Sequence, residues 1–166
     1  DKPMLSRAWA AGYPPASTFK LITAAYLLEK DLMDPNYLPD PCYGSYRLGG
    51  TDFGCWTSHG RLSLVEALAY SCNIFFYQAA QLGSIDGLAD FARSMGMGSR
   101  TSSVLSGERS GMVPYAEDLD RLYGSDGWGR GNLLNLAVGQ GELLATPVQV
   151  ARMAGQIASR GAMPPL

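Results

Sequence analysis

The feature that most constrains this chain is a pair of prolines leading into a long apolar run. Pro14 and Pro15 cannot lie inside a helix, but proline is well tolerated immediately before one or in its first turn. Residues 21–28 (Leu-Ile-Thr-Ala-Ala-Tyr-Leu-Leu) follow, and they are apolar and rich in helix formers. The sequence therefore predicts a buried helix over about residues 17–31 whose start is set by the prolines.

A serine and a lysine stand three residues apart at this helix start. The spacing puts Ser17 and Lys20 on the same face of the helix. A serine alone is a poor nucleophile at neutral pH, and a neighbouring amine is one way to activate it. Taken alone, Ser-x-x-Lys more often marks a helix N-cap followed by a solvated lysine. The apolar flanks argue against a solvated lysine here, so the pair is a candidate nucleophile and base.

Composition limits the class of protein. The chain has 166 residues, of which 46% are apolar and 17% charged, and these values predict one folded domain rather than a disordered segment. The net charge is −2 and there is no basic run, so nucleic acid is not expected as a partner. No apolar stretch reaches the length of a membrane span, so neither a membrane span nor a signal peptide is expected in these residues.

Helical periodicity and capping residues predict three further helices. Ser63 and Glu66 form a capping box that begins one continuous helix. The Gly-Gly pair at 49–50 favours a short hairpin, whereas residues 101–128 are predicted to be surface loop and residues 133–138 a short apolar segment. The three predicted helices cover residues 63–82, 86–95 and 147–160, the last with Val150, Met153, Ala154 and Ile157 as its buried stripe.

A second motif changes the weight of the first. Ser71, Cys72 and Asn73 form a Ser-x-Asn sequence 54 residues after Ser17. Alone it fits ordinary helix packing, but together with Ser17 and Lys20 the chain resembles the class B penicillin-binding proteins, in particular their elongation (rod-shape) type. The segments that carry the resemblance are residues 13–20, 55–60, 69–78, 107–114, 135–141 and 146–149.

The resemblance implies a serine D,D-transpeptidase that cross-links peptidoglycan and is acylated by β-lactams. It assigns Ser17 as the nucleophile that attacks the D-alanyl-D-alanine carbonyl. Lys20, with its pKa lowered by burial, takes the serine proton. Ser71 relays a proton to the leaving amine, and Asn73 binds the substrate amide and positions Lys20. The backbone N–H of Ser17 and one from a strand form the oxyanion hole.

The resemblance also implies partners and a location. The partners are the peptidoglycan stem peptide ending in D-Ala-D-Ala, β-lactam antibiotics and the membrane-bound cell-wall elongation machinery. The location is the bacterial inner membrane, with the catalytic domain on the periplasmic side.

One family motif is missing, because the lysines are Lys2, Lys20 and Lys30 and none begins a Lys-Thr-Gly sequence. We therefore expect residues 1–166 to be a partial transpeptidase domain that is inactive alone. The expected fold is mainly α: the helical part of the α/β penicillin-binding transpeptidase (serine β-lactamase-like) fold, with most sheet strands missing.

Three other functions compete with this prediction. A serine β-lactamase shares both motifs but needs a glutamate that activates the deacylating water, and neither Glu108 nor Glu142 stands in a Glu-x-x-Leu-Asn sequence. A β-lactam sensor domain would be acylated without cross-linking. A helical domain in which the serines only pack and cap is the third.

The three cysteines leave two alternatives open. A Cys42–Cys55 disulfide and reduced thiols are equally compatible with the sequence. Cys42, Asp52, Cys55 and His59 also crowd one loop, and thiolate and imidazole ligands suit zinc. The spacing contains no Cys-x-x-Cys pair, so the prediction is no cofactor, with zinc at these residues as the lesser alternative.

Overall fold

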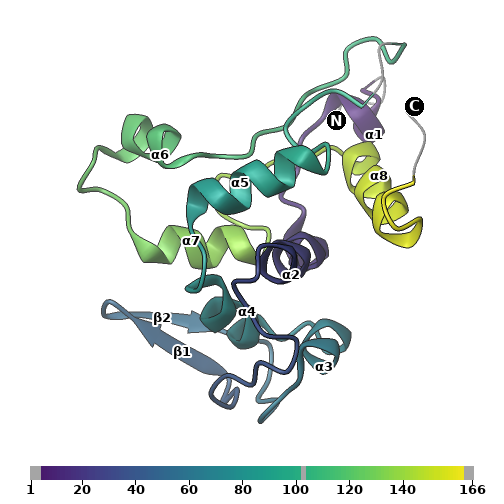
Figure 1. Ribbon diagram of the computed structural model, residues 1–166. Helices are drawn as coiled ribbons and strands as arrows, with labels where there is room; N and C mark the ends of the chain where they lie inside the picture. Colours follow the sequence, from purple (N-terminus) through teal and green to yellow (C-terminus); the bar gives the residue numbers. More distant parts are fainter. Residues whose placement is uncertain (1–4, 102–103, 163–166) are drawn as a thin grey trace.

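The computed structural model describes residues 5–101 and 104–162, which are mainly helical with one small sheet (Figure 1). This confirms the predicted fold class. No helix in these ranges combines the length and apolar character needed to cross a membrane. In chain order the elements are α1 (Arg7–Ala10), the 3₁₀ helix η1 (Ala16–Phe19), α2 (Lys20–Glu29), β1 (Ser45–Leu48), β2 (Thr51–Gly54), α3 (Leu64–Ala69), α4 (Asn73–Ala80), α5 (Ile85–Ser94), α6 (Ala116–Tyr123), α7 (Arg130–Ala137) and α8 (Pro147–Ala158).

The core is built around α2, which lies near the centre of Figure 1. It contacts α4 and α5, and α4 in turn packs on α7. Phe19, Ile22 and Leu27 from the η1–α2 segment are fully buried, as are Phe75 and Phe76 of α4 to within 2%. Burying apolar surface contributes about 25 cal/mol per Å². The contact between α2 and α4 is therefore stabilising, and it holds the N-terminal ends of the two helices in place relative to each other.

The helix predicted over residues 63–82 is wrong in one respect: it is two helices. The capping box at Ser63 is present and begins α3. The chain then leaves the helix, because Ser71 has φ +53°, and its N–H and that of Cys72 close the end of α3 on Leu68 O and Ala67 O. Helix α4 starts again at Asn73. Ser71 therefore lies in a tight break between two helices. The sequence has no glycine or proline there that would have predicted the break.

Three other predictions need correction. The loop predicted over residues 101–128 contains α6, and residues 133–137 belong to α7, with Val138 as its C-cap, rather than to a short separate segment. Of the stripe predicted on α8, Met153 is buried and Val150 half-buried, whereas Ala154 and Ile157 are exposed.

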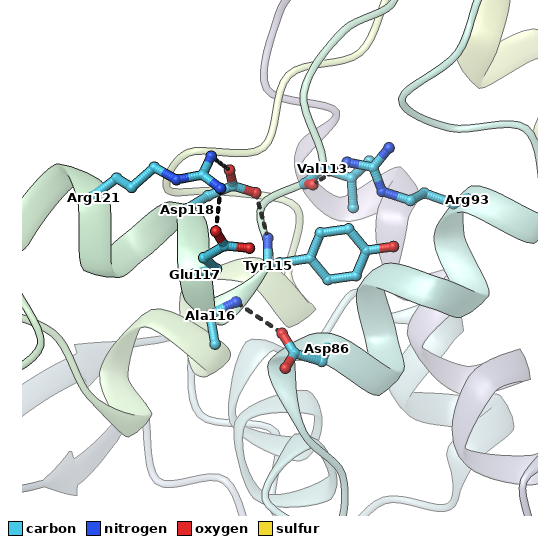
Figure 2. Close-up of polar contacts among 8 residues, drawn as sticks. All are labelled: Asp86, Arg93, Val113, Tyr115, Ala116, Glu117, Asp118 and Arg121. Carbon is cyan, nitrogen blue, oxygen red and sulfur yellow. Dashed lines mark hydrogen bonds and ion pairs between the residues drawn. The ribbon is translucent and has the colours of Figure 1, made fainter.

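Polar contacts join the start of α6 to α5, and Figure 2 shows those made by Asp86 and Arg93. The N–H of Ala116 donates to Asp86 at 2.8 Å, and the hydroxyl of Tyr115 donates to Asp90 at 2.9 Å. The Arg93 guanidinium lies 4.8 Å from the centre of the Tyr115 ring. These polar contacts hold the start of α6, and Leu119 is its one buried residue.

The predicted hairpin is confirmed. Strands β1 and β2 pair antiparallel with Leu48 opposite Thr51, and both Gly49 and Gly50 have positive φ, as two-residue hairpin turns require. Phe53 packs edge-on against Tyr77 of α4 at 5.5 Å between ring centres. This contact anchors the hairpin to the helix that begins at Asn73.

We expect Asp31→Gly to stabilise the protein. Asp31 follows the last turn of α2 with φ +53°, and its N–H and that of Leu32 close the helix on Leu28 O and Leu27 O. Glycine relieves the left-handed strain at this position, so the free energy of unfolding should rise by about 1 kcal/mol. Lys30→Gly is the control, because Lys30 has φ −93° and gains no such relief. Chemical denaturation measures both; equal or lower stability of Asp31→Gly contradicts the account.

Candidate active site

The site is organised around the side-chain amine of Lys20, a residue that is only 1% exposed. Nζ lies 3.1 Å from Ser17 Oγ, 2.9 Å from Ser71 Oγ and 2.8 Å from Ser71 O. The Oδ1 atom of Asn73 is its fourth neighbour, at 2.6 Å. The structure therefore brings together all four residues that the sequence predicted as catalytic or substrate-binding, from two segments more than 50 residues apart.

Ser17 is presented by the turn that precedes α2. It lies in η1, and Pro15 is the N-cap residue of that helix. Ser17 is exposed, whereas Phe19 and Lys20 are buried. The 3₁₀ geometry repeats every three residues, which places Ser17 directly over Lys20. The predicted nucleophile is thus exposed to solvent, whereas the neighbouring amine is not.

Ser71 and Asn73 reach Lys20 because the chain breaks between α3 and α4. The left-handed conformation of Ser71 turns both its carbonyl and its hydroxyl toward Nζ. Asn73, at the first turn of α4, is held from its other side because Nδ2 donates to Gly54 O at 3.2 Å. The end of β2 therefore orients the amide that contacts Lys20.

Burial lowers the pKa of Lys20 from its usual 10.5 to about 8, although thiolates at Cys55 and Cys72 would raise it. With a pKa of about 8, about a tenth of the amine is neutral at pH 7. A neutral amine has two N–H groups and one lone pair. Ser71 O and Asn73 Oδ1 can accept the two N–H groups, which leaves the lone pair to accept the proton of Ser17 Oγ.

A cluster of sulfur and nitrogen atoms adjoins the site. Cys42, Cys55, His59 and Cys72 place one ligand atom each within 4.8 Å of the others, and all three cysteines are free thiols. The backbone N–H of Asn73 donates to Cys55 Sγ at 3.3 Å. The cluster therefore adjoins the Ser-x-Asn segment directly, since Cys72 stands between Ser71 and Asn73.

Two distances within the cluster match those of a tetrahedral zinc site. A tetrahedral zinc ion separates a sulfur from a nitrogen ligand by about 3.6 Å. His59 Nδ1 lies 3.5 Å from Cys42 Sγ and 3.6 Å from Cys55 Sγ. Asp52, a sequence candidate, is exposed on β2 opposite Arg47 and does not belong to the cluster.

Cys72 takes the fourth position, and sequence reasoning missed it. It is the middle residue of the Ser-x-Asn motif and lies 13 residues beyond His59. Proximity in sequence therefore did not place it with the other candidate ligands.

A serine hydroxyl, a buried amine of lowered pKa and a second serine are the groups expected of a serine acyl-transfer site. The sequence profile of the "Penicillin binding protein transpeptidase domain" matches residues 1–166, and the chain belongs to this family. The resemblance to class B penicillin-binding proteins is thereby confirmed.

Two curated relatives agree with this family. Peptidoglycan D,D-transpeptidase MrdA of Acinetobacter baumannii is 32% identical over 97% of this chain. MrdA of Escherichia coli K12 is 35% identical over 92% of it. The chain spans 24% of the length of each of these relatives.

Solved structures show the same fold. A crystal structure of Pseudomonas aeruginosa PBP2 in complex with WCK 5153 superposes with a TM-score of 0.88 at 28% identity, covering 99% of this chain and 40% of that one. Helicobacter pylori PBP2, in a complex with MreC, gives a TM-score of 0.88 at 32% identity, covering 95% and 30%.

We expect acylation of Ser17 to speed up as the pH rises through about 8. In the predicted assignment the neutral form of Lys20 is the base, and its lowered pKa of about 8 means that the reactive fraction grows about tenfold per pH unit below that value and levels off above it. Rates of labelling by a fluorescent penicillin in the full-length protein measure this profile. A rate that is independent of pH between 6 and 9 contradicts the assignment.

Asn73→Asp should move that profile to higher pH. A carboxylate at the position of Oδ1, 2.6 Å from Nζ, favours the ammonium form and raises the pKa of Lys20 by about one unit or more. Asn132→Asp is the matched control, because Asn132 Oδ1 accepts from Gly129 N at the start of α7. Superimposable profiles for the two variants would refute the electrostatic link between Asn73 and Lys20.

Proposed function

We propose that the chain is the helical part of a peptidoglycan D,D-transpeptidase domain. In this proposal the full-length protein cross-links stem peptides through a serine acyl-enzyme and is acylated at the same serine by β-lactams. One observation carries it: Lys20 Nζ lies within hydrogen-bond distance of two serine hydroxyls that are 54 residues apart in sequence. The family match across residues 1–166 supports the same reaction class.

The first half of the reaction releases the terminal D-alanine of the donor stem peptide. Ser17 Oγ attacks the carbonyl carbon of the D-alanyl-D-alanine bond and transfers its proton to the neutral Lys20 amine. The tetrahedral intermediate collapses, the C–N bond breaks, and the leaving amine takes a proton from the Lys20 ammonium through the Ser71 hydroxyl. Asn73 binds the amide of the substrate. An ester of Ser17 remains.

The second half transfers the acyl group. The amine of a neighbouring stem peptide attacks the ester, its proton returns through the same residues to Ser17 Oγ, and a new peptide bond links the two stems. Because Lys20 both takes and gives the proton, a pKa near neutrality suits it to both steps.

The substrate determines where such a protein works. Peptidoglycan lies outside the cytoplasmic membrane, so we propose a catalytic domain on the periplasmic side of a protein anchored in the inner membrane. Two of the solved neighbours are described as a complex with MreC and as a peptidoglycan synthase complex. They support cell-wall elongation machinery as the partner.

Two alternatives remain distinct from this proposal. A β-lactamase needs a carboxylate that activates water at the ester, but Glu108 is buried and accepts from Thr101, and Glu142 accepts from the Tyr123 hydroxyl at 2.6 Å. Both glutamates are thus engaged elsewhere. A β-lactam sensor would be acylated but would not join two stem peptides.

The direct test replaces the nucleophile. Ser17→Ala in the full-length protein should abolish covalent labelling by fluorescent penicillin, because Ser17 supplies the exposed hydroxyl beside the Lys20 amine. Ser6→Ala, at the start of α1, is the matched control and should label like the unaltered protein. Undiminished labelling of Ser17→Ala contradicts the proposal. Formation of a cross-linked dimer from donor and acceptor stem peptides separates a transpeptidase from a sensor.

The same labelling assay on the 166-residue chain alone tests the expectation that it is not acylated by itself; stoichiometric labelling of Ser17 would overturn that expectation.

We further propose that Cys42, Cys55, His59 and Cys72 bind one zinc ion with a structural role. The donor set of three thiolates and one imidazole is typical of structural zinc. Such an ion would hold the segment after the hairpin against the start of α4, where Cys55 Sγ already accepts from the Asn73 N–H. It would thereby fix the backbone of the Ser-x-Asn segment.

Metal analysis tests this proposal. Purified protein should contain about one zinc per chain, and Cys55→Ser should lower the zinc content and the melting temperature together, because three ligands bind zinc more weakly than four. Asp52→Asn is the control and should retain the metal, since Asp52 lies outside the cluster. Zinc-free protein with the melting temperature unchanged by a chelator contradicts the proposal.

A further inference from the structure

We propose that the end of α7, and Gly139 in particular, positions the turn that carries the nucleophile; this inference rests on the proposed acyl-transfer function. The carbonyl of Gly139 accepts a hydrogen bond from Ala16 N at 2.8 Å. Ala16 directly precedes Ser17, so the bond fixes the backbone from which the nucleophile projects. Gly139 is a positioning residue, because it contacts the turn and not the reacting atoms.

The way α7 ends directs this carbonyl toward the nucleophile turn. Gly139 N donates to Leu136 O at 2.9 Å, and Gln140 N donates to Asn135 O at 2.9 Å. Together with φ +76° at Gly139, these bonds form a helix end of the Schellman type. The N–H groups after the helix are thereby satisfied inside the turn, and the carbonyl of Gly139 is left to accept from another segment.

The approach of the two segments leaves no space for a side chain. A Cβ atom at position 139 would lie 2.1 Å from Ala16 O and 2.8 Å from Ala16 N. These are backbone atoms, which cannot rotate away as the end of a side chain can. Any larger residue at this position must therefore displace the turn that presents Ser17.

The nucleophile turn needs such an anchor because of its own conformation. Ala16 has φ +49°, a left-handed conformation that is unfavourable for a residue with a side chain. A second bond ties the same end of α7 to α2, since the buried hydroxyl of Thr23 donates to Ala137 O at 2.8 Å. The two hydrogen bonds hold the turn in place between α2 and α7, and they thereby set the distance from Ser17 Oγ to Lys20 Nζ.

Gly141 offers a matched control within the same loop. Its φ is +71°, close to the +76° of Gly139. Alanine therefore introduces similar backbone strain at the two positions. The Cβ atom at position 141 would meet only Asn135 Cβ, at 3.5 Å, which is an ordinary contact. The two variants differ in whether they push on the nucleophile turn.

The experiment compares Gly139→Ala and Gly141→Ala in the full-length protein. Labelling by fluorescent penicillin gives the first-order acylation constant, the reversible binding constant and the final labelled fraction. We expect Gly139→Ala to acylate about 100-fold more slowly, the order of loss expected when a reacting group is displaced by about 1 Å, with the binding constant retained. Gly141→Ala should acylate within about threefold of the unaltered protein.

Two results would overturn the inference. Equal acylation constants for the two variants mean that Gly139 only ends α7. A smaller labelled fraction at an unchanged acylation constant means that Gly139→Ala lowers stability and nothing else. Absence of labelling in the unaltered protein would instead contradict the proposed function, so the two failures are distinguishable.

A second pair of variants keeps the test decisive if Gly139→Ala does not fold. Thr23→Val keeps the shape of the side chain but removes the donor to Ala137 O, and should lower the acylation constant about fivefold, the worth of one neutral hydrogen bond. Thr23→Ser retains the hydroxyl and should restore the rate. Equal rates for valine, serine and threonine at this position would overturn the inference.

Discussion

The arrangement of this protein depends on how one buried amine is held. Moving a charged ammonium out of water is unfavourable, and Lys20 is almost wholly buried. Oxygen atoms of Ser17, Ser71 and Asn73 surround Nζ and offset part of that cost. These oxygens come from the start of α2 and from the break before α4, so the helices must pack closely enough to keep both ends within hydrogen-bond reach. The same burial that lowers the pKa of the amine makes it a suitable base.

Backbone strain occurs on both sides of that amine. Ala16 precedes the nucleophile and Ser71 carries the second hydroxyl, and each has a left-handed conformation. Such conformations are unfavourable and persist where the surrounding structure determines them. The carbonyl of Gly139 holds one side, whereas the end of β2 and the sulfur cluster hold the other through Asn73. The hairpin and the sulfur cluster therefore hold Asn73 in place, and the end of α7 holds the turn before Ser17.

Features that depend on local sequence were predictable, and those that depend on long-range packing were not. The helix after the prolines, the hairpin at the Gly-Gly pair and the capping box at Ser63 all follow from neighbouring residues. The break at Ser71 does not, because its left-handed turn is stabilised by contacts with Lys20, 51 residues away. Asp52 was chosen for proximity in sequence, whereas Cys72 reaches the cluster through the fold. Helix α6 was not predicted, because it is short and has one buried residue, Leu119.

The central claim is that burial turns Lys20 into a base that is partly neutral near physiological pH. Because the chain contains only Lys2, Lys20 and Lys30, each lysine can be followed separately by carbon-13 NMR of the side-chain Cε atoms during a pH titration. The account predicts one lysine that titrates at about 8 and is lost from the spectrum in Lys20→Met. Absence of a lysine that titrates near about 8 in the folded chain would contradict it.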